Sequence, residues 1–284
     1  MRSFLQSTKS LNIDADSSLK RSELGYTISS STSSMATIEN LPHIIYDATN
    51  FIAVFAFYRK VKKYTGPLFT IRRGADNLEK TCYSTEEAIE FLNGGTGFVM
   101  AWYNQTGDGK YFIETFAAAQ PTFISSDSQM FGAPSMDLST NRGMTGNITN
   151  TNTNSHCYTI AFVTYTTGNR ILAGSNNWLV GPYYGIYNVH AGSFSGGVSV
   201  QPNVMKIQSA YRLNNGGYFN RVNGVSLGVS AGTITAGTLN LGIRGNYSEP
   251  AGSRIAELLI KDDIRTIEDI AMVEGSANGR YRLW

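Results

Sequence analysis

Apolar and polar residues alternate with a period of two in several segments of the second half of the chain. This alternation is typical of strands that place one face in a core. The segments are 158–165, 204–208, 238–243 and 255–260. Asn- and Gly-rich positions at 214–217 and 222–225 predict hairpin turns. We therefore expect an all-β fold in which two sheets pack into a sandwich.

The first half of the folded region mixes strand patterns with short helices. Apolar residues at three- and four-residue spacing predict a short helix over 53–63, and 68–72 and 98–103 read as strands. Ser84, followed by acidic residues, predicts the N-cap of a helix that ends near Asn93.

Two further segments complete the predicted elements. The capping-box pattern at Thr266 predicts a closing helix over 266–274. The Thr-, Asn- and Gly-rich segment 139–154 predicts a long loop.

Residues 1–42 differ from the rest of the chain. They include a serine- and threonine-rich run at 29–34 and show no apolar period, so alone they bury too little surface to offset the entropy of ordering. A disordered tail and an arm that orders against a neighbouring subunit both remain open. We expect this arm at 1–42 and one domain at 43–284.

Charged residues make up 15% of the 284-residue chain, against about 25% in average domains, and the net charge is +2. The one dense group of cations, at 59–63 and 72–73, reads as a solvated surface and not as a nucleic-acid site. Cys82 and Cys157 match no metal spacing, and both a single bridge and two buried thiols are open. No cofactor or metal, signal peptide or membrane span is expected.

Two motifs carry a resemblance to a known family. Residues 64–77 contain a Tyr-Thr-Gly-Pro-Leu turn and a strand that ends in Arg-Arg before Asp-Asn, and residues 102–109 read Trp-Tyr-Asn-Gln-Thr-Gly-Asp-Gly. A Gln-Pro pair follows at 120–121. Together they resemble the catalytic domain of fungal α-L-arabinofuranosidase B and the related concanavalin-like domains of bacteriophage virion proteins. Asn104 stands where the family has Asp.

The resemblance implies a two-sheet concanavalin A-like jelly roll, with a few short helices and the N-terminal arm. A retaining glycosidase needs two carboxyl groups about 5–5.5 Å apart. No Asp or Glu occurs between Asp137 and Glu249, where most of the predicted sandwich strands lie. We therefore expect no catalytic residues and no enzyme activity. The alternative, an arabinofuranosidase-like hydrolase, would depend on Glu249 and Glu257.

The two motifs themselves suggest structural roles. Arg72 and Arg73 precede Asp76, and an arginine–carboxylate pair there would tie this segment to the sandwich. Tyr103, Asn104 and Gln105 can satisfy the backbone groups of a turn.

Aromatic residues beside amides form the candidate binding surface. Such residues suit a glycan site, a subunit interface or the core, and all three interpretations stay open. The candidates are Trp178, Tyr183, Tyr184, Tyr187, Tyr211 and Tyr218.

These observations favour a non-catalytic structural protein of a phage head or tail appendage, with a lectin-like domain that has host surface glycans as candidate ligands. The expected location is the virion. The expected partners are other virion proteins, bound through 1–42, and further copies of this chain, with a trimer suggested by analogy to phage fibres. We expect no nucleic acid or membrane partner.

Overall fold

The computed structural model describes residues 44–139, 142–150, 156–165, 170–174, 177–213, 216–232, 237–242 and 251–284. The predicted arm at 1–42 and Glu249 lie outside these ranges. In chain order, the described strands are β1 (Phe51–Ala56), β2 (Phe69–Arg73), β3 (Glu79–Cys82), β4 (Gly97–Tyr103), β5 (Tyr111–Ile113), β6 (Thr122–Asp127), β7 (Ala133–Asp137), β8 (Gly143–Asn150), β9 (Cys157–Thr164), β10 (Leu172–Gly174), β11 (Trp178–Tyr183), β12 (Ile186–His190), β13 (Met205–Arg212), β14 (Tyr218–Val222), β15 (Val225–Ser230), β16 (Gly237–Gly242) and β17 (Ser253–Lys261).

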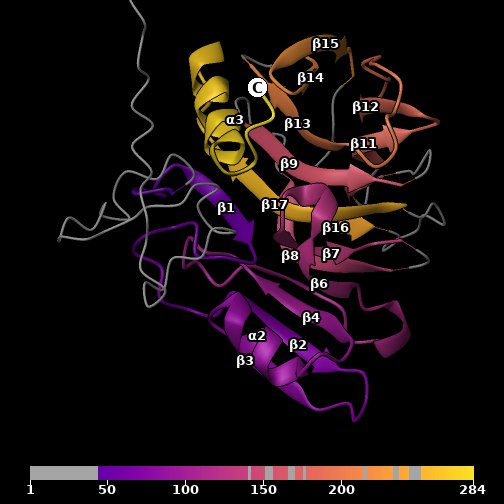
Figure 1. The fold of residues 1–284 in the computed structure, drawn as a ribbon. Coiled ribbons are helices and arrows are strands. Elements are labelled where there is room, and N and C mark those ends of the chain that lie inside the picture. Colours follow the sequence, from indigo (N-terminus) through magenta and orange to yellow (C-terminus); the bar gives the residue numbers. More distant parts are fainter. Residues whose placement is uncertain are drawn as a thin grey trace, which may run out of the picture.

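The pairings between these strands are antiparallel and link them into one nearly closed, sandwich-like sheet (Figure 1). One run of neighbours is β15-β14-β13-β9-β17-β7-β6-β4-β5-β8-β16-β10-β11-β12, and β1 pairs with β17. One side chain links the two end regions of this run, because Asn220 Nδ2 on β14, next to the terminal β15, donates to the Tyr187 carbonyl on β12 at 2.9 Å. The expected all-β sandwich is confirmed.

The interior is dense in aromatic rings. Phe57 stacks on Trp102 with ring centroids 5.1 Å apart, and Phe55 lies 5.2 Å from Trp102 and 5.0 Å from Phe112. All four side chains have no solvent exposure. Rings of this size bury large apolar areas, so this cluster holds β1, β4 and β5 together.

Two α-helices flank the described strands: α2 (Thr85–Leu92) and α3 (Ile267–Tyr281). Ser84 caps α2 through the Glu87 N–H, and Asn93 ends it in the left-handed conformation. Thr266 opens α3 with a capping box to Asp269. Two short 3-10 helices, η2 (Ala117–Ala119) and η3 (Ser128–Met130), lie in loops. The predicted helices after Ser84 and Thr266 are confirmed.

Helix α3 covers the outer face of the strands that include β1, β9 and β17 (Figure 1). Val54 on β1 packs under α3 with Val273, whereas Phe55 on β1 faces the aromatic interior. Strands buried on both faces have near-continuous apolar sequences, which periodicity alone cannot distinguish from a buried helix. For this reason the predicted helix over 53–63 is wrong, and its first part is strand β1.

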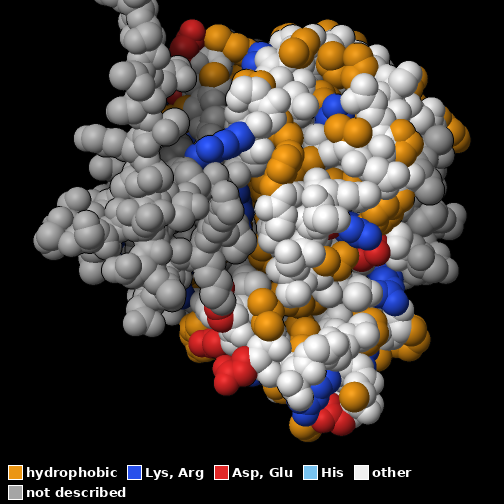
Figure 2. Space-filling model, viewed as in Figure 1, with side chains coloured by type: hydrophobic (Ala, Val, Ile, Leu, Met, Phe, Trp, Pro, Cys, Tyr) orange, Lys and Arg blue, Asp and Glu red, His pale blue; other side chains and the backbone are white. Residues whose placement is uncertain are grey.

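A second expectation is also wrong. The segment 139–154 was expected to be a loop, but β8 occupies Gly143–Asn150 and pairs with β16. Its Asn and Gly residues have weak strand propensity, so pairing with neighbouring strands decides its conformation. The face shown in Figure 2 is largely uncharged, in keeping with the composition. Within the described residues, no helix is long and apolar enough to cross a bilayer.

Candidate functional site

A buried ion pair lies between β17 and the segment after β1. Lys60 Nζ lies 2.7 Å from Glu257 Oε1, and both side chains are at most 1% exposed. The Tyr58 hydroxyl donates to Glu257 Oε2 at 2.5 Å, and Lys60 Nζ donates to the Ser276 carbonyl of α3 at 3.0 Å. Burial lowers the pKa of Lys60, and the charge of Glu257 opposes that shift. Glu257 is thus buried, its negative charge is balanced by Lys60, and it presents no open face to a substrate.

Lys60 was expected among solvated surface cations, and that expectation is wrong. Its neighbours in sequence, Lys62 and Lys63, are exposed, whereas Lys60 has no solvent exposure. A buried carboxylate 197 positions later in the chain holds it there, and sequence spacing gives no signal for such a pair.

The other buried acids that the structure describes are also engaged. Asp127 accepts from Ser135 at 2.9 Å and from Arg254 at 3.0 Å. Glu274 pairs with Arg221 at 3.0 Å, and Glu114 accepts from the Phe116 N–H at 2.7 Å. Glycosidase carboxyls face a cleft, one of them with a raised pKa. The buried acids described here are tied to donors instead.

The first motif is built as a structural tie. Arg73 makes two parallel bonds to Asp76, at 3.0 and 2.6 Å, so the expected arginine–carboxylate pair is present. Arg72 donates to Gln120 at 2.7 Å and to Asn77 at 2.6 Å. These bonds connect the end of β2 to the Gln-Pro pair at 120–121.

The second motif supports the chain around β1. Gln105 Oε1 accepts from the N–H groups of Lys60 and Val61 at 2.8 and 3.2 Å, and its Nε2 donates to the carbonyls of Ala56 and Tyr58 at 3.2 and 2.8 Å. One buried amide thus satisfies four backbone groups of the segment that follows β1.

Asn104 and Tyr103 complete this support. Asn104 Oδ1 accepts from the Val54 N–H at 2.7 Å, and its Nδ2 donates to Asp108 Oδ1 at 2.6 Å. The Tyr103 hydroxyl lies 3.0 Å from the Thr70 hydroxyl. Like Gln105, these residues take part in fold-supporting contacts.

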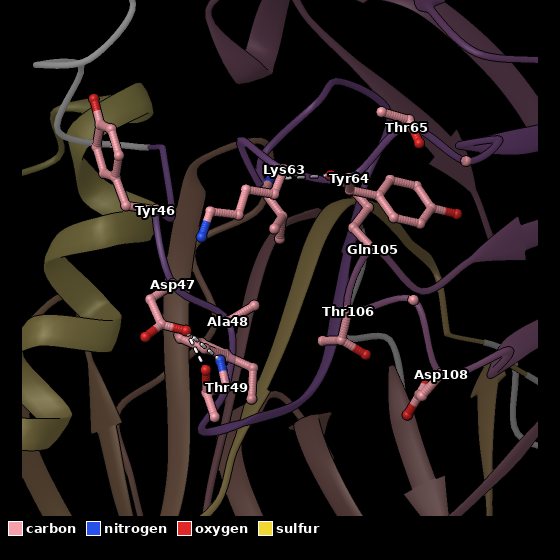
Figure 3. Close-up of a pocket in the computed structure, with 14 residues that line it drawn as sticks. Tyr46, Asp47, Ala48, Thr49, Lys63, Tyr64, Thr65, Gln105, Thr106 and Asp108 are labelled. Atoms are coloured by element: carbon pink, nitrogen blue, oxygen red, sulfur yellow. Dashed lines mark hydrogen bonds between the residues drawn. The ribbon is translucent and has the colours of Figure 1, made fainter.

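The two motifs also border a surface hollow of about 690 Å³. Its walls come from 46–51, 61–66 and 105–108. Figure 3 shows Tyr46 and Asp47 on one side of the hollow and Thr106 and Asp108 on the other, with Lys63 between them. Hydroxyls, carboxylates and an amine therefore line one open space.

The pKa of each carboxyl group in the hollow is lowered, which favours the ionised form. Hydrogen bonds from Thr49 lower the pKa of Asp47. Burial alone would raise the pKa of Asp108, but hydrogen bonds from Lys110 and Asn104 outweigh it and lower the pKa. A general acid needs a raised pKa. The hollow can accept hydrogen bonds from hydroxyl groups, but these two acids are poorly suited to protonate a leaving group.

Cations accompany the rings of the hollow. Lys62 Nζ lies 5.1 Å from the centroid of Tyr46, and the Arg59 guanidinium lies 5.9 Å from that of Tyr64. Such contacts compete with a sugar for a ring face. The hollow is therefore mainly a polar site.

Most of the aromatic binding candidates lie in the core. Trp178, Tyr187, Tyr211 and Tyr218 are at most 3% exposed. Tyr211 stacks on Phe219, and the Tyr218 hydroxyl shares a hydrogen bond with His156 Nε2. The core interpretation fits these four.

Tyr183 and Tyr184 lie at the tip of the β11–β12 hairpin. Tyr183 is 9% exposed and Tyr184 is 78% exposed. The structure brings them together with His190 and Phe194, which sequence reasoning missed because ring contacts across a hairpin leave no motif.

No His, Cys, Asp or Glu grouping suited to a metal ion occurs in the described part of the chain. Cys82 and Cys157 are both free and buried, which excludes the single bridge between them. Burial raises the pKa of each thiol to about 12.

The sequence matches no family model and no curated protein. Solved structures do resemble the fold. An arabinofuranosidase complexed with arabinofuranosyl-α-1,2-xylobiose aligns at 12% identity with a TM-score of 0.60, and a GH54 α-L-arabinofuranosidase soaked with a cyclic sulfate inhibitor at 11% and 0.61. Each alignment covers 81% of this chain and 63% of the other, so the chain spans less than two thirds of these enzymes. At this identity the likeness shows a shared β fold.

Proposed function

We propose that this chain is a non-catalytic structural protein of a bacteriophage particle, built on an arabinofuranosidase-type sandwich with a lectin-like role. One observation carries the non-catalytic part. The described buried acids are tied to donors or cations, and the two acids of the hollow have lowered pKa values. The middle of the sequence, from 138 to 248, has no acid at all.

The phage assignment rests on the sequence motifs at 64–77 and 102–109, which resemble virion domains of this fold. In this proposal residues 1–42 join the protein to other virion proteins, and the sandwich forms a homo-oligomer, with a trimer as the working stoichiometry. Mass spectrometry of purified particles tests it, and we expect the chain at a fixed ratio to the capsid protein. Absence from the particles would end the virion assignment.

The alternative is an arabinofuranosidase-like hydrolase, which the fold likeness favours; among the described acids, those that border the open hollow would be its candidate catalytic groups. Release of p-nitrophenol from 4-nitrophenyl α-L-arabinofuranoside by the full chain tests it. Under the non-catalytic proposal, the wild-type chain and the Asp47→Asn and Asp108→Asn variants all release p-nitrophenol at the same rate as buffer alone. A rate above buffer that either substitution abolishes would establish the hydrolase.

A further inference from the structure

The β11–β12 hairpin and the loop that follows it carry a cluster of rings that we name the aromatic platform: Tyr183, Tyr184, His190 and Phe194. Tyr183 and Phe194 stack with centroids 5.1 Å apart and planes 19° apart. Tyr184 meets Tyr183 edge to face at 4.4 Å, and His190 lies 4.7 Å from Phe194. Tyr184 and Phe194 remain 78% and 48% exposed, so apolar ring surface is presented to solvent.

Polar contacts through Arg170 and Asn177 connect Tyr183 to His190. Arg170 lies with its guanidinium 5.4 Å from the Tyr183 centroid and donates to Asn177 Oδ1 at 2.9 Å. The carbonyl of Asn177 in turn lies 2.7 Å from His190 Nδ1. Rings and polar groups therefore support one another around the platform. Because Oδ1 of the exposed Asn177 is engaged, its amide NH₂ is the group suited to a ligand acceptor.

The loop that carries Phe194 is fixed on both sides. The Ser195 N–H donates to the Val189 carbonyl at 2.9 Å, and Asn220 Nδ2 donates to the Gly196 carbonyl at 3.0 Å. A Cβ on Gly197 would lie 1.9 Å from the Tyr187 carbonyl oxygen, so this approach requires glycine. A fixed loop loses little entropy when a ligand binds, which favours affinity.

The backbone at Tyr184 is unusual for a tyrosine. Tyr184 and Gly185 form the hairpin turn with φ values of 48° and 75°. Such turns favour Asn, Asp or Gly at both positions, and a tyrosine there lowers stability. Of the large apolar side chains described, Tyr184 is also the most exposed. At Tyr184 this costly conformation coincides with the contacts of the platform rings, which is the combination that suggests a functional site.

From these observations we propose that the aromatic platform is a glycan-binding site, in which a sugar ring lies with its C–H face on Tyr184 and Phe194. The amide of Asn177 and the imidazole of His190 hydrogen-bond the sugar hydroxyls. This inference rests on the lectin-like part of the proposed function and names its site.

A sugar suits the platform better than a protein partner. The two exposed rings offer about 250 Å², so a stable protein interface of about 800 Å² on each partner would have to extend well beyond the platform. No Asp or Glu lies between 138 and 248, so the sequence around the platform contributes no acid. Strands β11 and β12, which carry the platform, lie on the opposite side of the fold from α3 and β1 (Figure 1). The platform is therefore separate from the hollow, which borders β1.

A printed glycan array probed with the full chain tests the site. The key variant is Tyr184→Asn, which removes the ring and inserts a residue that this turn prefers, so it folds. The matched control is Phe131→Asn, because Phe131 is 62% exposed with φ 55° but lies outside the platform. Thermal unfolding of each variant confirms folding.

We expect the wild-type chain to bind a subset of the saccharides, with about ten-fold weaker binding in Tyr184→Asn and in Phe194→Ala and no change in Phe131→Asn. Wild-type signal at background overturns the inference, as does equal binding by Tyr184→Asn. A change in sedimentation of Tyr184→Asn without loss of glycan signal would replace it with a subunit interface. These results are separate from the particle composition that tests the virion assignment.

Discussion

Removal of one partner from the Lys60–Glu257 pair should destabilise the fold strongly. In Glu257→Gln the ammonium of Lys60 stays buried without its anion, and the Arg280 guanidinium remains close, 4.0 Å from the Tyr58 ring centroid. Breaking a buried pair at one end costs about 3–5 kcal/mol. For a domain of this size, that corresponds to a fall in Tm of roughly 6–20 °C.

Urea unfolding of the wild type, Lys60→Met, Glu257→Gln and the double variant measures this cost. Each single variant should lower the urea midpoint by about 1–2 M. The double variant should be more stable than the sum of the single effects by at least about 2 kcal/mol, because it leaves neither charge without its partner. Asp263→Asn is the control, since the Asp263–Arg265 pair is exposed and its loss should leave the midpoint unchanged.

Two results would refute this reasoning. Additive effects of the single substitutions, within about 0.5 kcal/mol, would mean that the two side chains are not coupled. Single variants as stable as the wild type would mean that water reaches the pair and that Glu257 is not enclosed.

Three further predictions concern the second motif and the thiols. Gln105→Ala should lower the free energy of unfolding by about 3 kcal/mol, because it leaves buried N–H groups of the segment after β1 without an acceptor. Urea titration measures this change. A loss below about 1 kcal/mol would mean that Gln105 does not support this segment. Asn104→Asp should destabilise the protein more at pH 7 than at pH 4, because the new carboxylate at position 104 then faces that of Asp108, and protonation of one relieves the repulsion. Thermal scans at the two pH values measure this difference. Equal losses of stability at both would contradict the predicted repulsion. Cys82 and Cys157, with pKa values of about 12, should resist a thiol reagent at pH 8 in the native protein and react after unfolding; rapid native reaction would show that they are accessible.

Local signals predicted those parts of the fold that depend on local chemistry. Ser84 and Thr266 marked helix starts because N-capping involves residues three apart. The turn at 222–225 was predictable because Asn223 and Gly224 tolerate their φ values of 49° and 77°. The bidentate pair of Arg73 with Asp76 was also predictable, because the two residues are only three positions apart.

Tertiary context decided the features that the sequence concealed. Strand β1 has the same composition as a buried helix, and its pairing with β17 settles its conformation. The partner of Lys60 is 197 positions away, and the ring contacts of Phe194 depend on how its loop folds back onto β12. Aromatic candidates in alternating strands divide between the core and the surface according to a register that composition does not give. Trp178 therefore packs inside, whereas Tyr184, in a turn, faces solvent.

The distribution of charge along the chain explains how this fold can present a binding surface without catalysis. The first and last of the described strands, β1 and β17, pair with each other, and the Lys60–Glu257 ion pair joins the same two regions, so the acid Glu257 helps to close the sandwich. The central strands carry the exposed rings of the platform and no carboxylate. In the proposed site, the amide of Asn177, the imidazole of His190 and the exposed rings all come from a stretch of sequence, 138–248, that contains no Asp or Glu. Hydrolysis needs one group to donate a proton and another to attack or activate water, and this stretch of the chain supplies no carboxylate for either role.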